Sequence, residues 1–595
     1  MKNIREFLKK APLLFDGAMG TYYKAAPGTE CEQANLTDPA GVMAVHREYL
    51  AAGANAIKTN TFSLPRLAAA HAPDWEALAQ AGWKLAEAAA GETGTAVFAD
   101  LGPALDTEAL PAAEVYTTVA LKFAALGAKN FLFETLSSDA GIAEAARAVR
   151  EKVPDAFVLV SFAVLPDGYT REGMYCRDLA RRMAESGAVD AIGLNCVSAP
   201  GAMRTLAKQL SGCGLPLSVM PNAGYPVVTR THVKYQGRPE YFAKELGRIA
   251  AEGTVRILGG CCGTTPAHIA ALRKELDALP EPQESSAAAG FSTPKAPAVE
   301  KEDAFLQKLR AGEKVIAIEL DSPRNADLTG YLDGARKLQA AGADLLTIAD
   351  CPIARARMDS SLVASRVHRE LGLCTLPHMT CRDRNLNAAK ALLLGLYAEG
   401  IREVLAITGD PIPTAERDEV KNVYQFNSRK LASYIVSLAG EGREMPSPMT
   451  VFGALNLNAR NFDVELRRAE QKLEHGMSGF LTQPVLSAQA VENLKKTRET
   501  LGERAKILAG IMPVVSQRNA IFMENEINGI HVEERIIEQF AGLDRAQGEE
   551  LGLAVSLEMA RAALPYADGF YLMTPFNRVA LMERLIARLK QEVLA

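Results

Sequence analysis

Short apolar runs alternate along the chain with longer stretches in which apolar residues recur every three or four positions. Runs of this length predict β-strands, and the stretches between them predict amphipathic helices. In the first half the expected strands cover residues 13–18, 56–62, 96–101, 131–136, 157–164, 191–196, 215–222 and 256–262. In the second half they cover residues 315–320, 345–350, 375–383, 403–410, 450–457, 479–485, 506–515 and 568–574. Such alternation is typical of (β/α)8 barrels, so we expect an α/β protein with two tandem TIM barrels.

A composition break separates the two halves. Residues 281–302 are rich in Pro, Ser, Ala and Glu and have no apolar periodicity, which is typical of a flexible linker. We therefore expect one domain at residues 1–280 and another at residues 303–595. A doubly wound open sheet is the alternative fold, but no strand–helix turn carries the Gly-x-Gly-x-x-Gly pattern of a dinucleotide-binding sheet.

Composition narrows the class of protein. The 595 residues are 48% hydrophobic and 23% charged, which is ordinary for a soluble globular protein. A net charge of −5 argues against a nucleic-acid or anionic-membrane partner, and no apolar run reaches membrane-spanning length. Nine cysteines are too sparse for a disulfide scaffold and odd in number, which favours reduced thiols. We expect a cytoplasmic protein.

Polar side chains gather at the ends of the expected strands, after the apolar residues. In a barrel these ends meet on one rim, where active sites are built. Single Ser or Asp residues there are also common as helix caps. In the first half the polar strand ends are Asp16, Asn60, Asp100, Glu134, Asn195, Cys196, Asn222, Cys261 and Cys262. Caps do not account for three cysteines and a glutamate on one rim.

The three cysteines suggest a metal. Cys261 and Cys262 are adjacent and flanked by glycines, which let the backbone leave strand geometry so that both thiolates can reach one ion. Cys196 ends another apolar run in a similar context. Three thiolates with an open fourth position suit a catalytic zinc that captures an external sulfur ligand. The alternative is three buried cysteines with a structural role only.

Two further features on this rim suit an amino acid. The turn Asp16-Gly17-Ala18 exposes backbone N–H groups that can receive a carboxylate, and Glu134 can hold an ammonium group. The alternatives are an ordinary glycine turn and an ion pair at the barrel mouth. Together the two features would bind an amino acid by both ends, with its side chain toward the metal.

The first half resembles the homocysteine-binding barrel of cobalamin-dependent methionine synthase, with betaine–homocysteine methyltransferases as more distant relatives. The motifs that carry the resemblance are residues 16–21 (DGAMGT), 58–62 (KTNTF), 193–196 (GLNC), 221–224 (PNAG) and 259–266 (GGCCGTTP). The resemblance implies that Cys196, Cys261 and Cys262 are zinc ligands. It also implies that the turn of Asp16, Gly17 and Ala18 holds the homocysteine carboxylate, that Glu134 holds its amino group, and that Asn222 faces the zinc when substrate is absent.

The second half carries a different set of rim residues, with an acid, a histidine and several amide and hydroxyl groups. By themselves they suggest a site for a polar, planar, multi-ring ligand, and each also fits a structural place in a barrel. The region resembles methylenetetrahydrofolate reductase, a flavin-dependent barrel. The motifs are residues 377–381 (PHMTC), 405–411 (LAITGDP), 480–484 (FLTQP) and 510–513 (GIMP).

The resemblance assigns roles to single residues. Glu319 is the proton donor that opens the five-membered ring of the folate, which then accepts hydride from FAD. An acid with this role near neutral pH needs a raised pKa. Asp410 lies near the pyrimidine edge of the flavin, and Gln483 holds the pterin. The residues expected to hold FAD are Thr347, His378 and Lys472.

The sequence departs from the reductase pattern at two places. An Arg-Gly-Asp step of the family reads Thr408-Gly409-Asp410 here, which removes a cation beside the flavin. Leu320 follows Glu319, where the family usually has an aromatic residue. Both changes leave the electron donor open between NAD(P)H, the usual one, a ferredoxin and another flavoprotein.

The hypothesis is a bifunctional enzyme of methionine and one-carbon metabolism, with homocysteine and 5,10-methylenetetrahydrofolate as substrates. In one alternative, the second barrel is a non-catalytic flavin- or folate-binding regulatory module. In another, the zinc is structural and the first barrel a binding scaffold. The methyl donor stays open between a corrinoid protein partner, S-methylmethionine, S-adenosylmethionine and 5-methyltetrahydrofolate. A homo-oligomer is compatible with the sequence.

Overall fold

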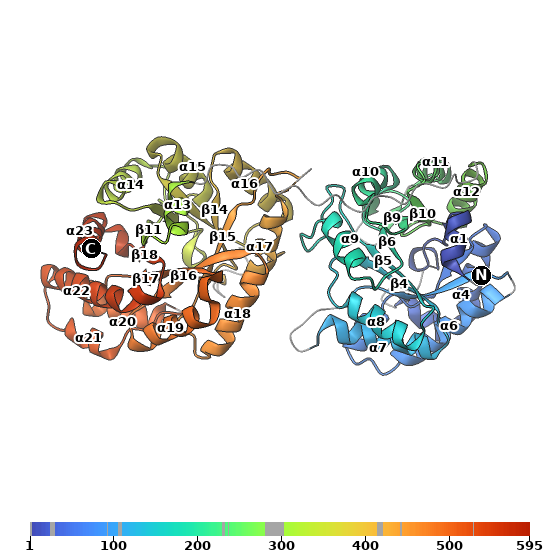
Figure 1. The fold of residues 1–595 in the computed structure, drawn as a ribbon, viewed down its shortest axis with the longest axis horizontal. Helices are drawn as coiled ribbons and strands as arrows, with labels where there is room; N and C mark the ends of the chain where they lie inside the picture. Colours follow the sequence, from blue (N-terminus) through green and yellow to red (C-terminus); the bar gives the residue numbers. More distant parts are fainter. Residues whose placement is uncertain are drawn as a thin grey trace. The chain divides into compact units, whose positions relative to one another are not determined.

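A computed structural model describes most of the chain. The described residues are 3–23, 30–91, 93–104, 110–228, 233–235, 237–279, 303–412, 421–440, 443–527 and 529–594. The chain divides into two compact units, Met1–Thr293 and Pro294–Ala595, each a sheet surrounded by helices (Figure 1). The linker expected at residues 281–302 lies outside the described residues. The expectation of two tandem barrels is confirmed by the strand topology of the two units.

The first unit is a parallel eight-stranded barrel with the order β1-β10-β7-β6-β5-β4-β3-β2. An isolated parallel bridge between Phe15 and Ala56 joins its first and last strands. Its strands are β1 (Leu13–Leu14), β2 (Ala56–Lys58), β3 (Ala96–Leu101), β4 (Asn130–Leu136), β5 (Phe157–Phe162), β6 (Ala191–Asn195), β7 (Leu217–Met220) and β10 (Val255–Leu258). A separate antiparallel hairpin, β8 (Pro226–Val228) and β9 (Val233–Tyr235), was not expected from the sequence.

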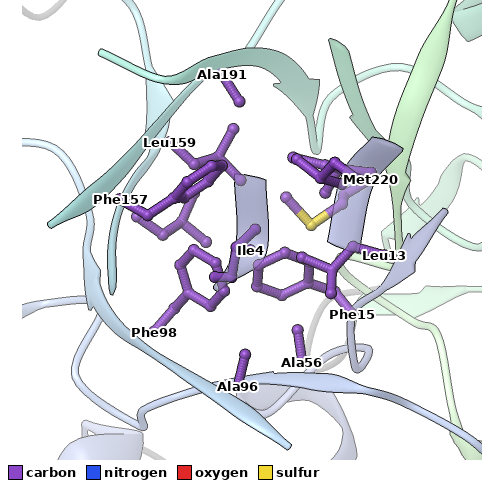
Figure 2. Packing of buried hydrophobic residues seen from close by; sticks show 13 residues of the cluster. Ile4, Leu13, Phe15, Ala56, Ala96, Phe98, Phe157, Leu159, Ala191 and Met220 are labelled. Atoms are coloured by element: carbon purple, nitrogen blue, oxygen red, sulfur yellow. The ribbon is translucent and has the colours of Figure 1, made fainter. Parts of the chain in front are cut away.

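Helices follow the strands of the first unit. They are α1 (Ile4–Lys10), α2 (Gly20–Tyr23), η1 (Cys31–Gln33), α3 (Ala34–Thr37), α4 (Pro39–Ala51), α5 (Leu64–Ala69), α6 (Trp75–Gly91), α7 (Ala112–Ala125), α8 (Ile142–Lys152), α9 (Cys176–Glu185), α10 (Pro200–Leu210), α11 (Pro239–Ala251) and α12 (Pro266–Asp277). Helix α1 contributes Ile4 and Leu8 to a core with residues at the amino ends of the strands, such as Ala96 and Phe157 (Figure 2). The opposite, carboxyl ends form the rim that carries the polar residues.

The second unit is a closed parallel barrel with its strands in sequence order. They are β11 (Val315–Glu319), β12 (Leu345–Ile348), β13 (Cys374–Thr380), β14 (Glu403–Ile407), β15 (Thr450–Leu455), β16 (Met477–Pro484), β17 (Lys506–Ile511) and β18 (Gly569–Met573). Helix α13 (Ala304–Arg310) takes the place that α1 has in the first unit, because its Phe305, Leu306 and Leu309 pack into the barrel core.

The outer layer of the second unit is formed by α14 (Thr329–Ala341), η2 (Pro352–Ala354), α15 (Ser360–Leu371), α16 (Leu386–Ala398), α17 (Ser428–Ser437), α18 (Phe462–Glu474), α19 (Ala488–Leu501), η4 (Gly502–Arg504), α20 (Gln517–Glu526), α21 (Glu534–Gln539), α22 (Arg545–Ala563), η5 (Leu564–Tyr566), η6 (Pro575–Asn577) and α23 (Val579–Glu592). Within the described ranges, no helix of either unit has both the length and the apolar character needed to cross a membrane.

Many strands end earlier than their apolar runs predicted. The run at residues 13–18 gives the strand Leu13–Leu14, and the run at residues 256–262 gives Val255–Leu258. The polar ends leave the sheet and turn into rim loops. At Cys196 the backbone even enters the left-handed region, with φ of 58°. This departure from strand geometry is what positions the polar side chains at the mouth of the barrel.

Candidate active sites on the two barrel rims

Three thiols meet on the rim of the first barrel. Cys196 follows β6, and Cys261 and Cys262 follow β10; their sulfur atoms all lie within 4.8 Å of one another. The sulfur atoms of Cys196 and Cys262 are 3.9 Å apart. Three sulfur donors at this spacing fit a tetrahedral zinc with one position left for a substrate. The sequence predicts this grouping of three cysteines, and the structure brings them together.

The backbone around the thiols is tightly held. The Cys261 N–H donates to the Pro221 carbonyl at 2.8 Å, and the Ala223 N–H donates to the Cys262 carbonyl at 2.9 Å. Asn222 lies between these two contacts, and its buried Oδ1 has no hydrogen-bond partner among the described residues. The predicted homocysteine-binding residue Asn222 is therefore anchored beside the cysteine pair with an unpaired polar atom.

Thr264 joins the cysteine loop to the predicted carboxylate-binding turn. Its Oγ1 donates to the Cys261 carbonyl at 2.6 Å and accepts from the Ala18 N–H at 3.0 Å. A Cβ on Gly260 would lie 2.4 Å from this Oγ1, and one on Gly17 would lie 2.6 Å from it. Both positions need glycine because the chain approaches Thr264 so closely. The Ala18 and Asp16 N–H groups are thus already used, which leaves the Gly17 N–H of the turn for a ligand.

A buried charge cluster lies beside the turn. The Lys58 Nζ is 3.5 Å from Glu134 Oε2, and the two side chains are only 8% and 7% exposed. Asn195 Nδ2 donates to the same Glu134 oxygen at 3.3 Å. Asp16 Oδ2 accepts from the Lys58 N–H at 3.0 Å. The structure therefore brings both predicted residues to Lys58, Glu134 to its ammonium group and Asp16 to its backbone N–H.

Sequence reasoning did not give Lys58 a role. The available signal was a lysine at the end of the apolar run that begins at Ala56, where a charged side chain needs a buried partner. Burial works against the charge on Lys58, but the carboxylates of Glu134 and Asp16 outweigh it and raise the Lys58 pKa well above its ordinary value. Burial also raises the pKa of Asp16 to about 7.

The thiols share their charge unequally. Hydrogen bonds from Cys196 and Cys261 lower the pKa of Cys262 to about 3. Hydrogen bonds with Cys196 and Cys262, together with burial, raise the pKa of Cys261 well above its ordinary value. Without a cation the cluster therefore favours one thiolate supported by protonated neighbours. Three thiolates together require a positive ion, which is the chemistry of a zinc site.

A cavity of about 560 Å³ opens onto these groups. Its walls include the three cysteines together with Asp16, Lys58 and Glu134, and it extends to Phe62 and Arg66. An amino acid inside it can reach the thiols and the charged cluster at the same time. This is the geometry expected of a site that holds an amino acid by its ends.

The rim of the second barrel centres on Glu319, the last residue of β11. Its neighbours in register are Thr347 on β12 and Met573 on β18. The hydroxyl of Tyr571 donates a hydrogen bond to Glu319 Oε2. His378 Nε2, from β13, lies 3.8 Å from the same oxygen. The predicted residues Glu319, Thr347 and His378 therefore lie on neighbouring strands, and Tyr571 joins them without having been foreseen.

Burial sets the protonation of this group. It raises the pKa of Glu319 to about 7, although the Tyr571 hydrogen bond acts in the opposite direction. It lowers the pKa of His378 to about 4, so the imidazole is neutral near pH 7. His378 Nε2 and Thr574 Oγ1 are buried and have no hydrogen-bond partner among the described residues. Unpaired buried polar atoms at the mouth fit a polar ligand such as a flavin.

The remaining predicted residues lie on other elements and make local contacts. Asp410 follows β14, and its Oδ2 accepts from the Ile353 N–H at 2.7 Å. Lys472 is in α18, where its Nζ donates to the Ala454 carbonyl at 2.6 Å and burial lowers its pKa. Gln483 is half-buried near the end of β16. Their roles toward FAD and the pterin stay predictions.

Comparisons with known proteins agree with the division into two units. Among curated proteins, the methionine synthase of Mycobacterium tuberculosis is 33% identical over 295 residues, which are 45% of this chain and 25% of the relative. The methionine synthase of Mycobacterium leprae is 33% identical over 295 residues, 45% of this chain and 24% of the relative. The chain thus spans about a quarter of the length of these curated relatives.

A solved structure and two family models complete the comparison. The crystal structure of the Escherichia coli homocysteine methyltransferase MmuM in its metallated form is 24% identical, with a TM-score of 0.38, and the match covers 46% of this chain and 99% of that chain. Residues 13–276 match the family model for homocysteine S-methyltransferase, and residues 304–590 match the one for methylenetetrahydrofolate reductase. The first unit thus matches the homocysteine S-methyltransferase family, and the second unit matches the methylenetetrahydrofolate reductase family.

Proposed function

We propose that the chain is a bifunctional enzyme of methionine and one-carbon metabolism. Its first barrel transfers a methyl group to the sulfur of homocysteine, giving methionine. Its second barrel reduces 5,10-methylenetetrahydrofolate to 5-methyltetrahydrofolate. The observation that carries the proposal is the cluster of three thiols within 4.8 Å of one another, which lines the same cavity as the buried Lys58–Glu134 pair. The two family matches support both halves.

In the first barrel, Cys196, Cys261 and Cys262 would hold Zn²⁺. Zinc, when bound, makes a thiol ligand more acidic and keeps it as the nucleophilic thiolate. Glu134 receives the ammonium group of homocysteine, and the turn from Asp16 to Ala18 receives its carboxylate at the Gly17 N–H. Burial raises the pKa of Glu134, and the Lys58 ammonium group lowers it, so Lys58 favours the ionised form that binds an ammonium group.

In the second barrel, FAD would be held by Thr347, His378, Asp410 and Lys472, and it would supply the hydride. NAD(P)H is the proposed reductant. The neutral His378 offers an unpaired ring nitrogen to a polar ligand. Gln483 holds the pterin by its amide. Glu319, with a pKa near 7, donates a proton to the folate nitrogen that leaves when the five-membered ring opens.

Zinc and methionine formation test the first half together. We expect about one zinc per chain by metal analysis, and Cys261→Ala should lose both the zinc and the methylation of homocysteine. Cys213→Ala is the matched control, because Cys213 is a buried cysteine of the same barrel outside the thiol cluster. Full activity of Cys261→Ala without zinc would overturn the proposal. Collapse of the whole domain would favour a structural metal instead.

The assay of methionine formation also identifies the methyl donor. Purified protein is incubated with homocysteine and 5-methyltetrahydrofolate labelled in its methyl group, with no corrinoid added. Labelled methionine would assign 5-methyltetrahydrofolate as the direct donor. If none forms, S-methylmethionine, S-adenosylmethionine and a methylated corrinoid protein are supplied in turn, and the donor that yields methionine is assigned.

A further inference from the structure

Tyr571 is built into the interior of the second barrel, directly below the proposed acid. It pairs in register with Ala317 on the adjacent strand β11. Residues two apart on a strand face the same side, so Ala317 and Glu319 both point into the barrel. The small Ala317 side chain leaves room for the phenol ring. Tyr571 is only 7% exposed and belongs to the barrel core.

The hydroxyl of Tyr571 engages one of the two carboxyl oxygens of Glu319. It donates to Oε2, the oxygen that also lies 3.8 Å from His378 Nε2. No hydrogen bond from the described part of the chain reaches the other oxygen, Oε1. The Glu319 side chain is 22% exposed, so it is not sealed inside the core. The two oxygens of this carboxyl group are therefore unequal.

We propose that Tyr571 is a positioning residue that fixes the orientation of Glu319, so that the acidic proton is carried on Oε1 and offered to the folate. A protonated carboxyl group has one O–H donor and keeps acceptor capacity on the other oxygen. Because Oε2 already accepts the phenol proton, the proton of the acid sits on Oε1. This inference rests on the proposed reductase function.

The hydrogen bond also stabilises the product of proton donation. When the Glu319 Oε1–H bond breaks, its proton goes to the folate ring nitrogen, and the electron pair of the breaking C–N bond stays on that nitrogen. The negative charge left on Glu319 is then stabilised by the Tyr571 O–H, since hydrogen bonds to ionised acceptors are the strong ones. Burial raises the pKa of Tyr571 well above its ordinary value, so the phenol keeps its proton throughout.

Burial and three groups on the elements around it set the acidity of Glu319. Burial raises the Glu319 pKa, the nearby Asp321 raises it further, and the Tyr571 hydroxyl and Arg357 guanidinium lower it. His378 has its own pKa lowered to about 4 and adds no charge near pH 7. Removal of the phenol oxygen should therefore make Glu319 a weaker acid that stays protonated to higher pH.

The test is Tyr571→Phe, which keeps the ring and removes only the oxygen. The first measurement needs no flavin: the infrared band of the protonated Glu319, identified by its loss in Glu319→Gln, is titrated against pH. We expect the midpoint to rise by about one pH unit, a tenfold change in the ionisation constant. The decline of folate turnover at alkaline pH should move upward by the same amount, and flavin reduction by NADH should be unchanged.

Tyr434→Phe is the matched control, because Tyr434 is another fully buried tyrosine of this barrel, in helix α17. It should leave the Glu319 midpoint where it is in the unchanged protein. A midpoint that Tyr571→Phe leaves unmoved would overturn the inference, as would an equal shift in Tyr434→Phe. If the unchanged protein fails to reduce methylenetetrahydrofolate, the proposed function fails, while the infrared titration still decides the link between Tyr571 and Glu319.

Discussion

At the scale of single residues, a buried ammonium group compensates the carboxylates on the rim of the first barrel. Lys58 lies 3.5 Å from Glu134, and Asp16 accepts from its backbone N–H. A buried ion pair of this kind is most costly to break from one side, because the partner charge remains buried without compensation. The stability of the first barrel therefore depends on keeping both charges of this pair at the proposed substrate site.

Lys58→Met should destabilise the first barrel by about 3 kcal/mol, because Glu134 and Asp16 lose their cation while the volume of the side chain is kept. The measurement is the urea midpoint of the unfolding transition of that barrel. The control is Lys9→Met, which breaks the exposed Lys9–Glu6 pair and should leave the urea midpoint close to that of the unchanged protein. Equal effects of the two substitutions would contradict the role of Lys58.

Glu319 gives a prediction with a pH dependence. Its raised pKa of about 7 means that the acid is protonated below pH 7 and loses its proton above it. Folate turnover should therefore be high at pH 6 and fall as the pH rises through about 7. Glu319→Gln should lower folate turnover by roughly 100-fold or more and leave flavin reduction by NADH intact, measured in separate stopped-flow half-reactions. Retained folate turnover in Glu319→Gln would contradict the role of Glu319 as the proton donor.

At the scale of elements, the rim loops depend on close backbone approaches that only glycine permits. Thr264 bridges the cysteine loop and the turn at Ala18, and Gly260 faces its hydroxyl with no room for a side chain. The element that holds the thiols is thus a loop stabilised by one threonine rather than a strand. Its geometry should fail if that threonine moves.

Gly260→Ala should displace Thr264, because the new Cβ would lie 2.4 Å from its Oγ1. We expect about 1–3 kcal/mol of destabilisation and a weaker affinity for zinc, measured by competition with a chelator. Gly91→Ala is the matched control, since nothing lies within 4 Å of a Cβ at that helical position. It should be neutral or slightly stabilising. Tight zinc binding in Gly260→Ala would show that the loop tolerates the shift.

The strands show which features of the fold could be predicted from the sequence. The apolar runs predicted every barrel strand, because a parallel sheet buried on both faces needs continuous apolar segments. They did not predict the strand ends, since the polar residues that complete each run turn out of the sheet at positions such as Cys196. The hairpin of β8 and β9 was missed because its few residues give no lasting alternation.

The candidate sites likewise contain some features that the sequence predicts and others that it does not. Adjacent cysteines between glycines and a third cysteine at a strand end were enough to predict the thiol cluster. The contact between Tyr571 and Glu319 joins residues 252 positions apart, and no local pattern marks it. The pairing of Lys58 on β2 with Glu134 on β4 likewise depends on how the barrel brings these two strand ends together on either side of β3, which a single sequence does not state.

At the scale of the whole molecule, each unit has its own hydrophobic core and its own barrel. We therefore expect residues 1–280 and 303–595 to fold when they are produced as separate chains. The first should bind zinc and the second FAD, measured by metal analysis and by flavin absorbance. The full chain serves as the control for both stoichiometries. Aggregation of either half would contradict independent folding.

The central claim is that three thiols hold a zinc ion whose remaining position takes the sulfur of homocysteine. X-ray absorption at the zinc edge measures the number of sulfur ligands directly, with and without homocysteine. We predict three sulfur ligands in the protein alone and four when homocysteine is added, with no such change for an amino acid that lacks a thiol. Four sulfur ligands before homocysteine is added, or three after it, would contradict the account.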